Sequence, residues 1–300
     1  MADREAFTVR DLRIALFSGN YNYERDGVNQ ALNRLVAYLL GQGAAVRIYS
    51  PTIDPPAFPP TGDLVSVPSL AVPGRSDYRL AKGLPGYLRE DIRRFSPNCF
   101  HVSAPDILGH RAVSMARSVG LPVLASMHTL FETYPGYYGM GFLERPAVTI
   151  LRRFYNRCDA IVTPTDDMAD RLRGQGVTRP ISVWERGVDH GQFNPSRRDN
   201  GWRRGFGIAD DELVIGFVGR VVLEKGLDVF ADVSAELTRR GVAHRVLVVG
   251  DGLAREWLAG QLPEAIFAGF QMGDDLGRAT ASMDIFLNPS VTETFGNVTL

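Results

Sequence analysis

The sequence predicts an α/β protein made of two Rossmann-like, doubly wound domains. Short apolar runs rich in β-branched residues alternate with longer stretches of helical periodicity, a pattern typical of parallel βαβ units. The pattern begins near residue 12, breaks into glycine, proline and charged residues around 186–196, and then starts again. With 300 residues, the chain also exceeds the usual size of one compact domain, so two domains are expected.

The N-terminal half is expected to form a parallel sheet with covering helices. Its first strand covers 12–17, and a helix then begins near Gly27, keeps its apolar residues on one face, and ends at two glycines. The proline-rich stretch 51–60 predicts a surface loop. The other predicted strands cover 45–50, 64–67, 99–102, 123–127 and 160–163, and the other helices cover 107–119 and 144–158.

The C-terminal half repeats this organisation. The segment that starts at residue 186 is expected to connect the two halves, so the predicted domains are 1–185 and 186–300. The chain stops where a further helix would begin after Gly296, so the second domain is expected to be incomplete and C-terminally truncated. Strands are predicted at 213–218, 245–249, 266–268 and 285–288, and helices at 227–240, 253–262 and 274–283.

The composition excludes several classes of function. The formal net charge is -1 and the pI is near 6.5, whereas nucleic-acid-binding domains are normally basic, so no nucleic-acid partner is expected. The N-terminus is charged, and no apolar run has the length of a signal peptide or a membrane span, so a cytoplasmic location is expected. The only two cysteines, Cys99 and Cys158, lack the spacing of a zinc site or a disulfide framework.

The residues after the first strand of the C-terminal half have the composition of a phosphate site. Gly219 and Gly226 let the backbone approach a ligand closely, and the following helix presents free N–H groups and the positive end of its dipole. Arg220 could hold phosphate oxygens in its guanidinium fork, while Lys225 acts as a point charge. Alternatively both are surface cations near Glu224, in which case an exposed ion pair contributes less than about 1 kcal/mol. The segment alone leaves both interpretations open.

A second candidate segment, 288–297, follows the last predicted strand. Ligands of open α/β sheets bind at the carboxyl ends of the strands, where this segment lies. Glu293 could accept hydrogen bonds from sugar hydroxyls, and the N–H groups around Phe295 and Gly296 could face a phosphate. Taken singly, a glutamate in a loop is more often simply solvated.

Several motifs occur in the order found in a known family. They are Gly219-Arg220 with Lys225-Gly226, then Val249-Gly250-Asp251-Gly252, then Phe267-Ala268-Gly269-Phe270, then Glu293-Thr294-Phe295-Gly296-Asn297. Through these motifs the chain resembles the retaining, E-x7-E type glycosyltransferases of family GT4, which have the GT-B fold. The resemblance implies an acceptor-side N-terminal domain and a C-terminal domain that binds a nucleotide-sugar.

The resemblance also implies roles for individual residues. Arg220 and Lys225 would bind the donor diphosphate, and Glu293 would contact the transferred sugar. The second glutamate of the motif would be the residue immediately after Leu300 and therefore has no position in this chain. The donor-binding residues implied in this half are Gly219, Arg220, Lys225, Glu293, Thr294, Phe295, Gly296 and Asn297.

Two residues of the N-terminal half match the same family. Gly27 corresponds to the glycine that lets this domain approach the donor phosphate, and His128 corresponds to a histidine beside the donor sugar. Because His128 follows the strand at 123–127, it lies at the carboxyl edge of the sheet, which favours a site residue over a turn residue held by backbone hydrogen bonds. With Arg220, Lys225 and Glu293, it completes the candidate catalytic set.

The acceptor side is predicted more weakly. The aromatic loop after His128 contains Tyr134 and Tyr137, whose rings could stack on a sugar or meet lipid, although such loops usually pack on themselves. Tyr21, Asn22 and Asp26 on the first loop are further candidates. Arg152, Arg153 and Arg157 could meet anionic lipid heads at the inner face of a membrane, or they could form a solvated helix face.

Other functions fit the sequence less well. A dinucleotide-dependent dehydrogenase would need spaced glycines after the first strand, and Ser18-Gly19-Asn20-Tyr21 lacks them. Sugar-nucleotide epimerases, sugar phosphorylases and a binding module without turnover remain alternatives. Because the chain contains no Asp-x-Asp pattern, we expect no metal and no other cofactor. The expected donor is a UDP- or GDP-sugar, with a mannosyl or glucosyl group preferred, and the expected acceptor is a lipid or a glycan.

Overall fold

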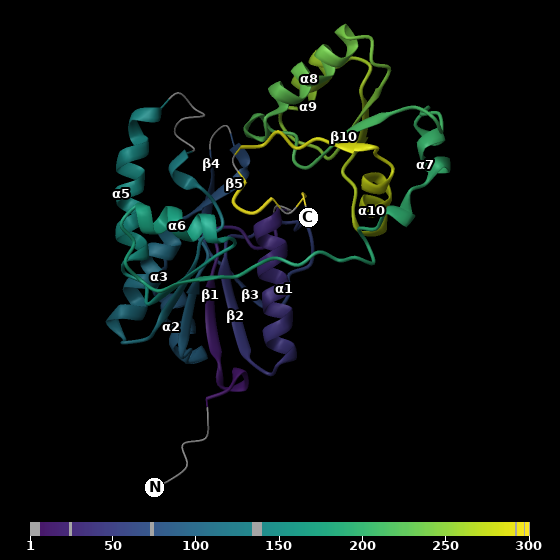
Figure 1. Ribbon diagram of the computed structural model, residues 1–300. Helices are drawn as coiled ribbons and strands as arrows, with labels where there is room; N and C mark the ends of the chain where they lie inside the picture. The colour runs from purple at the N-terminus through teal and green to yellow at the C-terminus, as the bar shows by residue number, and fades with distance from the viewer. Residues whose placement is uncertain are drawn as a thin grey trace. The chain divides into compact units, whose positions relative to one another are not determined.

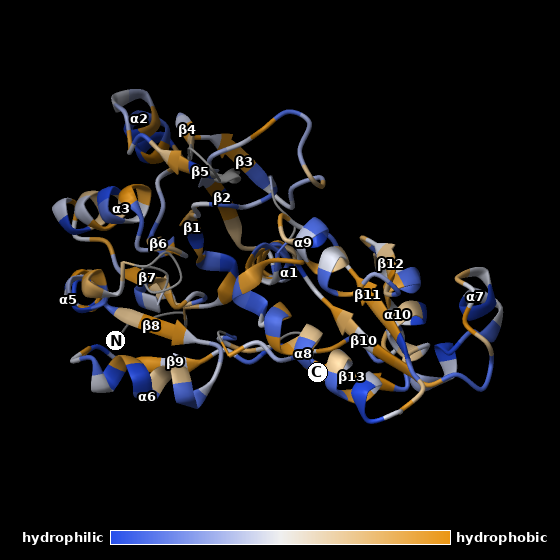
Figure 2. Ribbon diagram, turned by 90° about the horizontal axis from the view of Figure 1, so that it is seen from above, coloured by the Kyte–Doolittle hydropathy of each residue, from blue (hydrophilic) through white to orange (hydrophobic). Residues whose placement is uncertain are grey.

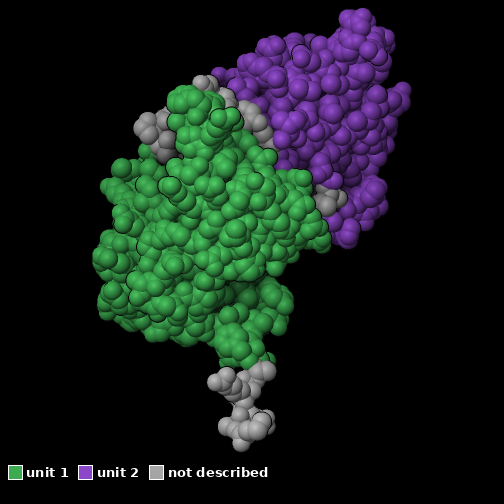
Figure 3. Space-filling view, turned by 60° about the vertical axis from the view of Figure 1, so that its left-hand side comes forward, with its two compact units in different colours: residues 1–186 green, residues 187–300 purple. Residues whose placement is uncertain are grey.

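The protein consists of two compact units, residues Met1–Arg186 and Gly187–Leu300 (Figure 3). The computed structural model describes residues 7–23, 26–72, 75–133, 140–291, 293–296 and 298–299. Each unit has a parallel sheet and its own hydrophobic cores (Figure 1). The predicted α/β class with two doubly wound sheets is therefore confirmed.

The sheet of the first unit has seven parallel strands in the order β3-β2-β1-β6-β7-β8-β9. The chain runs from β1 outward to β3 and then continues on the other side of β1 with β6. The direction of winding therefore changes between β1 and β6, where open α/β sheets bind their ligands. The strands are β1 (Arg13–Phe17), β2 (Ala45–Ser50), β3 (Asp63–Ser66), β6 (Cys99–Val102), β7 (Val123–Ser126), β8 (Ala160–Thr163) and β9 (Ile181–Val183).

Side chains of strand β1 alternate between two cores. Ala15 and Phe17 enter the larger core, whereas Ile14 and Leu16 pack on the opposite face with helix α1 (Gly27–Gly41). Burying a side chain as large as isoleucine, leucine or phenylalanine contributes about 1.5–3 kcal/mol. The strands are accordingly the more hydrophobic elements in Figure 2. The larger core is covered by α2 (Gly86–Phe95), α3 (Ile107–Ser118), α5 (Glu144–Tyr155) and α6 (Asp166–Gly174).

Several elements of the first unit were not expected from the sequence. Strands β4 (Ser69–Val72) and β5 (Arg75–Ala81) form an antiparallel hairpin beside the parallel sheet. Helix α2 buries only Leu88 and Ile92, because most of its residues are charged or polar, so its apolar stripe is too narrow to recognise. Helix α6 and strand β9 were also missed, and β9 has only three residues.

The second unit has a four-stranded parallel sheet in the order β12-β11-β10-β13. Its winding changes direction between β10 and β13. Helices α8 (Leu227–Arg239) and α9 (Arg255–Gln261) cover one face, and α7 (Asn200–Gly205) and α10 (Gly273–Ala281) cover the other. The strands are β10 (Val214–Val218), β11 (Arg245–Val249), β12 (Ile266–Gly269) and β13 (Ile285–Phe286). Short 3-10 helices occur at Val9–Asp11, Phe131–Thr133, Gly141–Leu143, Pro195–Arg197 and Leu223–Lys225.

Candidate functional site

Three glycine-containing loops meet at the carboxyl edge of the second sheet. The N–H of Gly219 donates to the carbonyl of Val249 at 3.0 Å, and the N–H of Gly250 donates to the carbonyl of Gly269 at 2.8 Å. A Cβ on Gly250 would lie 1.9 Å from the carbonyl oxygen of Gly219, and the φ of Gly250 is +135°. Only glycine fits this position, so the sequence itself lets the loops after β10, β11 and β12 touch through their backbones.

Lys225 and Glu293 come together at the point where the winding of this sheet changes. Lys225 precedes α8 on the loop after β10, and Glu293 lies on the loop after β13. The Lys225 Nζ and the Glu293 Oε1 are 2.5 Å apart, and their side chains are 22% and 25% exposed. Gly226, with a φ of +70°, allows this approach, because a Cβ there would lie 2.7 Å from the carbonyl oxygen of Pro289. The structure thus joins two residues that were predicted from separate motifs.

The other donor-site candidates of this unit lie close in sequence to Lys225 or to Glu293. Arg220 is half-buried on the loop after β10, and Thr294 and Phe295 are half-buried on the loop after β13. Gly296 is buried with a φ of +75°, and its carbonyl accepts a hydrogen bond from the N–H of Thr299 at 2.8 Å. Residues 298–299 form a turn, so the helix predicted after Gly296 does not begin within the described residues. Asn297 lies outside them.

In the first unit, one arginine connects the two donor-site candidates. Arg186 donates from Nη1 to the carbonyl of Gly27 at 3.2 Å, and its Nη2 lies 2.9 Å from Nδ1 of His128. Gly27 is the first residue of α1, and His128 follows β7. The ring of Trp184 meets the His128 ring edge to face at 5.8 Å. Arg186 and Trp184 were not predicted as site residues, because the sequence of their segment indicates only the end of a domain and a connection.

Two buried histidines lie near each other at this edge. Burial, followed by the charges of Arg186 and His101, holds the pKa of His128 well below its ordinary value of 6.5. Burial lowers the pKa of His101 to about 4, and its Nε2 lies 2.5 Å from the hydroxyl of Ser126. Both rings are therefore neutral near pH 7.

The acceptor-side candidates of the first loop make hydrogen bonds within the first unit. Tyr21 is fully buried and its hydroxyl donates to the carbonyl of Thr61 at 2.7 Å, so its ring is not exposed for stacking. Asn22 is also buried and donates to the carbonyl of Phe58. The carboxylate of Asp26 caps α1 by accepting from the N–H of Asn29 at 2.8 Å. Tyr134 and Tyr137 lie outside the described residues.

The segments on either side of residues 134–139 differ in exposure. Before them, Glu132 is buried and accepts hydrogen bonds from Arg171 of α6 and from Gln175, which follows α6, each at 2.9 Å. After them, the 3-10 helix Gly141–Leu143 and helix α5 expose both apolar and cationic side chains. Among the described residues, no helix is long and apolar enough to span a membrane. On the 3-10 helix, on α5 and just before them, the exposed apolar residues are Met140, Phe142, Leu143 and Ile150, and the exposed arginines are Arg145, Arg152 and Arg153.

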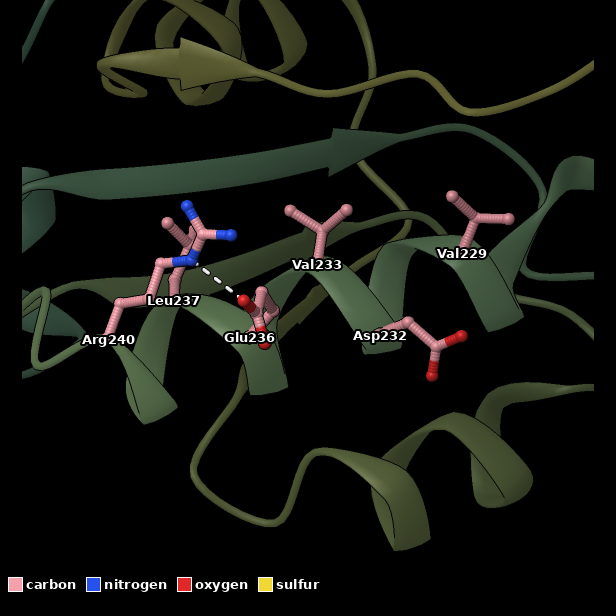
Figure 4. Close-up of a pocket in the computed structure, with 6 residues that line it drawn as sticks. All are labelled: Val229, Asp232, Val233, Glu236, Leu237 and Arg240. Atoms are coloured by element: carbon pink, nitrogen blue, oxygen red, sulfur yellow. Dashed lines mark hydrogen bonds and ion pairs between the residues drawn. The ribbon is translucent and has the colours of Figure 1, made fainter.

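No metal-binding cluster is found in the described parts of the chain, where no three His, Cys, Asp or Glu side chains are grouped as a metal site would require. A groove runs along α8, where Glu236 pairs with Arg240 (Figure 4). None of the predicted site residues lines this groove, whose lining residues are Val229, Asp232, Val233, Glu236, Leu237 and Arg240.

Comparison with known proteins decides the family. Residues 25–192 match the model of Glycosyltransferase Family 4, which covers more than half of the chain. The chain belongs to Glycosyltransferase Family 4. Residues 212–300 also match the model of Glycosyl transferases group 1. The predicted family and the prediction that this chain is a glycosyltransferase are therefore confirmed.

Individual relatives of this glycosyltransferase cover nearly the whole chain. It is 31% identical over 291 residues to the GDP-mannose-dependent alpha-mannosyltransferase of Mycolicibacterium smegmatis, across 95% of this chain and 75% of that protein. It is 25% identical over 298 residues to alpha-monoglucosyldiacylglycerol synthase of Streptococcus pneumoniae, across 95% of this chain and 67% of that protein.

Solved structures show the same fold. Sucrose-phosphate synthase from Thermosynechococcus elongatus matches with a TM-score of 0.72 and 17% identity, over 95% of this chain and 77% of that chain. This likeness confirms the predicted GT-B class. The roles of His128, Arg220, Lys225 and Glu293 stay predictions, which the geometry above makes specific enough to test.

Proposed function

We propose that this glycosyltransferase moves a hexosyl group, preferably mannosyl, from a nucleotide-sugar to a lipid or glycan, with retained anomeric configuration and without a metal. The observation that carries the proposal is the Lys225–Glu293 contact where the winding of the second sheet changes. The name of the Mycolicibacterium relative supports GDP-mannose as the donor. The name of the Streptococcus relative supports a lipid acceptor and a glucosyl alternative.

The charges at this point suit a departing diphosphate. An ammonium group has three N–H donors, so Lys225 can keep Glu293 as a partner and still donate to a phosphate oxygen. Arg220, on the same loop, would add a planar fork for further phosphate oxygens. Preorganised cations aimed at developing charge often supply the largest share of a rate enhancement. These two side chains would therefore do the work that a metal ion does in other transferases.

Glu293 would have a different task. Because an ionised carboxylate only accepts hydrogen bonds, it would bind hydroxyl groups of the transferred sugar. Its pairing with Lys225 fixes the side chain before the donor arrives, which reduces the conformational entropy lost when the donor binds. The acceptor hydroxyl would then attack from the face that the nucleotide leaves, and the anomeric configuration would be retained.

Nucleotide release tests this function directly. The protein is incubated with GDP-mannose, GDP-glucose, UDP-glucose or UDP-galactose and a diacylglycerol or glycan acceptor, with and without EDTA. We expect Lys225→Ala to lower kcat by about 100-fold or more, because it removes one cation from the leaving group. Arg204→Ala, which removes an exposed cation paired with Asp210, should leave turnover unchanged.

The outcomes separate the parts of the proposal. Turnover that EDTA abolishes would refute the metal-free mechanism. Inverted product configuration, read by NMR of the glycosidic bond, would refute retention. Full activity of Lys225→Ala would remove the leaving-group role of this residue.

A further inference from the structure

Arg186 links three segments of the first unit that are far apart along the chain. It follows β9 by three residues, and its two terminal nitrogens reach Gly27 and Nδ1 of His128 at 3.2 and 2.9 Å. Gly27 and His128 are 159 and 58 positions away. One guanidinium therefore ties the start of α1 to the segment that follows β7.

This contact fixes where the proton of His128 lies. A guanidinium only donates hydrogen bonds, and burial lowers the pKa of Arg186 to about 10, so the group stays protonated near pH 7. Nδ1 of His128 must then be the acceptor. Since the ring is neutral, its single proton is on Nε2.

Trp184 restricts the orientation of both partners. The His128 ring meets the Trp184 ring at 5.8 Å with an interplanar angle of 70°, and the Arg186 Cζ lies 5.3 Å from the Trp184 ring centroid. An arginine above an aromatic face is attracted by the electron-rich ring. The direction of the Nε2–H bond is therefore set by packing as well as by the hydrogen bond.

We propose that Arg186 is a positioning residue that holds His128 as the Nε2–H tautomer, so that His128 donates a hydrogen bond to an oxygen of the nucleotide-sugar and transfers no proton. This inference rests on the proposed function. A ring protonated on Nδ1 would present an acceptor at Nε2 and lose the contact with a sugar hydroxyl or phosphate oxygen that needs a donor. The charged or titratable groups that act on the pair are His101 on β6 for His128, and Asp26 and Arg34 for Arg186.

Nitrogen-15 NMR of the histidine rings tests the tautomer without any substrate. His128→Gln identifies the His128 signals, and the wild-type protein should show Nδ1 without a proton and Nε2 with one. In Arg186→Met the two tautomers should mix, whereas Arg186→Lys keeps a donor and should retain the Nε2–H form. Arg173→Met, an exposed arginine on α6, serves as the control. A protonated Nδ1 in the wild type, or an unchanged ring in Arg186→Met, would overturn the proposal.

Kinetics test whether Arg186 acts through His128. We expect Arg186→Met to lower kcat/KM by about 10- to 100-fold, because the ring then no longer presents Nε2–H in a fixed direction. In the His128→Gln background, Arg186→Met should have little further effect. Fully additive effects would contradict the inference. A protein that releases no nucleotide at any pH would instead refute the proposed function, while the NMR result still decides the tautomer.

Discussion

At the scale of single residues, the interior holds several polar side chains whose charge state depends on burial. Arg203 is completely buried, and Asp284 and the carbonyls of Ser282, Ala209 and Glu212 accept its hydrogen bonds. Burial keeps the rings of His101 and His128 neutral near pH 7, so protonation at acidic pH competes with folding.

The histidines make the first unit sensitive to acid. The pKa of His101 is about 4 in the folded protein and about 6.5 when the chain is unfolded, so the unfolded chain binds more protons between these values. Stability is therefore complete above about pH 6.5 and is lost as the pH falls toward 4. We expect His101→Gln to reduce the loss of unfolding free energy between about pH 7.5 and pH 5 by about 2 kcal/mol.

Urea unfolding at the two pH values measures this effect. His190→Gln, which changes an exposed histidine, should keep the wild-type pH dependence. If His101→Gln also kept it in full, the buried neutral state of His101 would not be the cause. His128 acts in the same direction, so some dependence should persist in every variant that retains it.

At the scale of elements, close backbone contact between loops builds the edge of the second sheet. Gly250 and Gly252 each occupy a position where a Cβ would lie within 2.4 Å of a carbonyl oxygen in the loop after β10. At Gly226, a Cβ would lie 2.7 Å from the carbonyl oxygen of Pro289 in the loop after β13. Packing of this kind leaves no side chain to adjust, so the loops hold a fixed geometry.

Gly250→Ala should therefore disturb this edge severely. The added Cβ would overlap the Gly219 carbonyl at a positive φ, and we expect a loss of about 2–4 kcal/mol in unfolding free energy together with weaker nucleotide binding. Gly260→Ala is the matched control, since nothing lies within 4 Å of its Cβ and alanine favours α9 by up to about 1 kcal/mol. Differential scanning calorimetry measures the change in stability, and nucleotide titration measures the change in binding. Equal results for the two variants would contradict this account.

At the scale of the whole molecule, the chain combines two separately cored units with a distinctive surface on the first. Phe142 is 77% exposed and Ile150 of α5 is 54% exposed, and Arg145, Arg152 and Arg153 of the same helix are also exposed. Apolar side chains enter the interface of a bilayer, while arginines pair with anionic headgroups. A lipid acceptor, as proposed, would be reached from such a surface.

Vesicle flotation tests this surface. The protein should float with vesicles that contain anionic lipid and not with neutral ones. Replacing Arg145, Arg152 and Arg153 by glutamine should weaken binding by about 100-fold, because each cation near the membrane contributes about 1 kcal/mol. Tyr38→Ser, which changes an exposed ring on α1, is the control. Equal binding by the triple variant would show that this surface does not meet the membrane.

The sequence by itself determined the elements and the order of the motifs. Strands such as 99–102 and 245–249 were predicted at the residues where they occur, because side-chain periodicity and β-branched composition are local properties. The motifs also placed Lys225 and Glu293 at strand ends. The antiparallel hairpin β4–β5 was missed, since its strands pair outside the repeating βαβ pattern.

Only the tertiary structure decided which of these residues meet. Lys225 and Glu293 are 68 positions apart, and they pair because the sheet order places β13 next to β10. Arg186 reaches His128 and Gly27 because β7 and β9 end, and α1 begins, at the same edge of one sheet. No local pattern encodes such contacts, since strand order depends on the packing of the whole unit. The sequence therefore specified the reactive groups, and the fold decided their partners and protonation states.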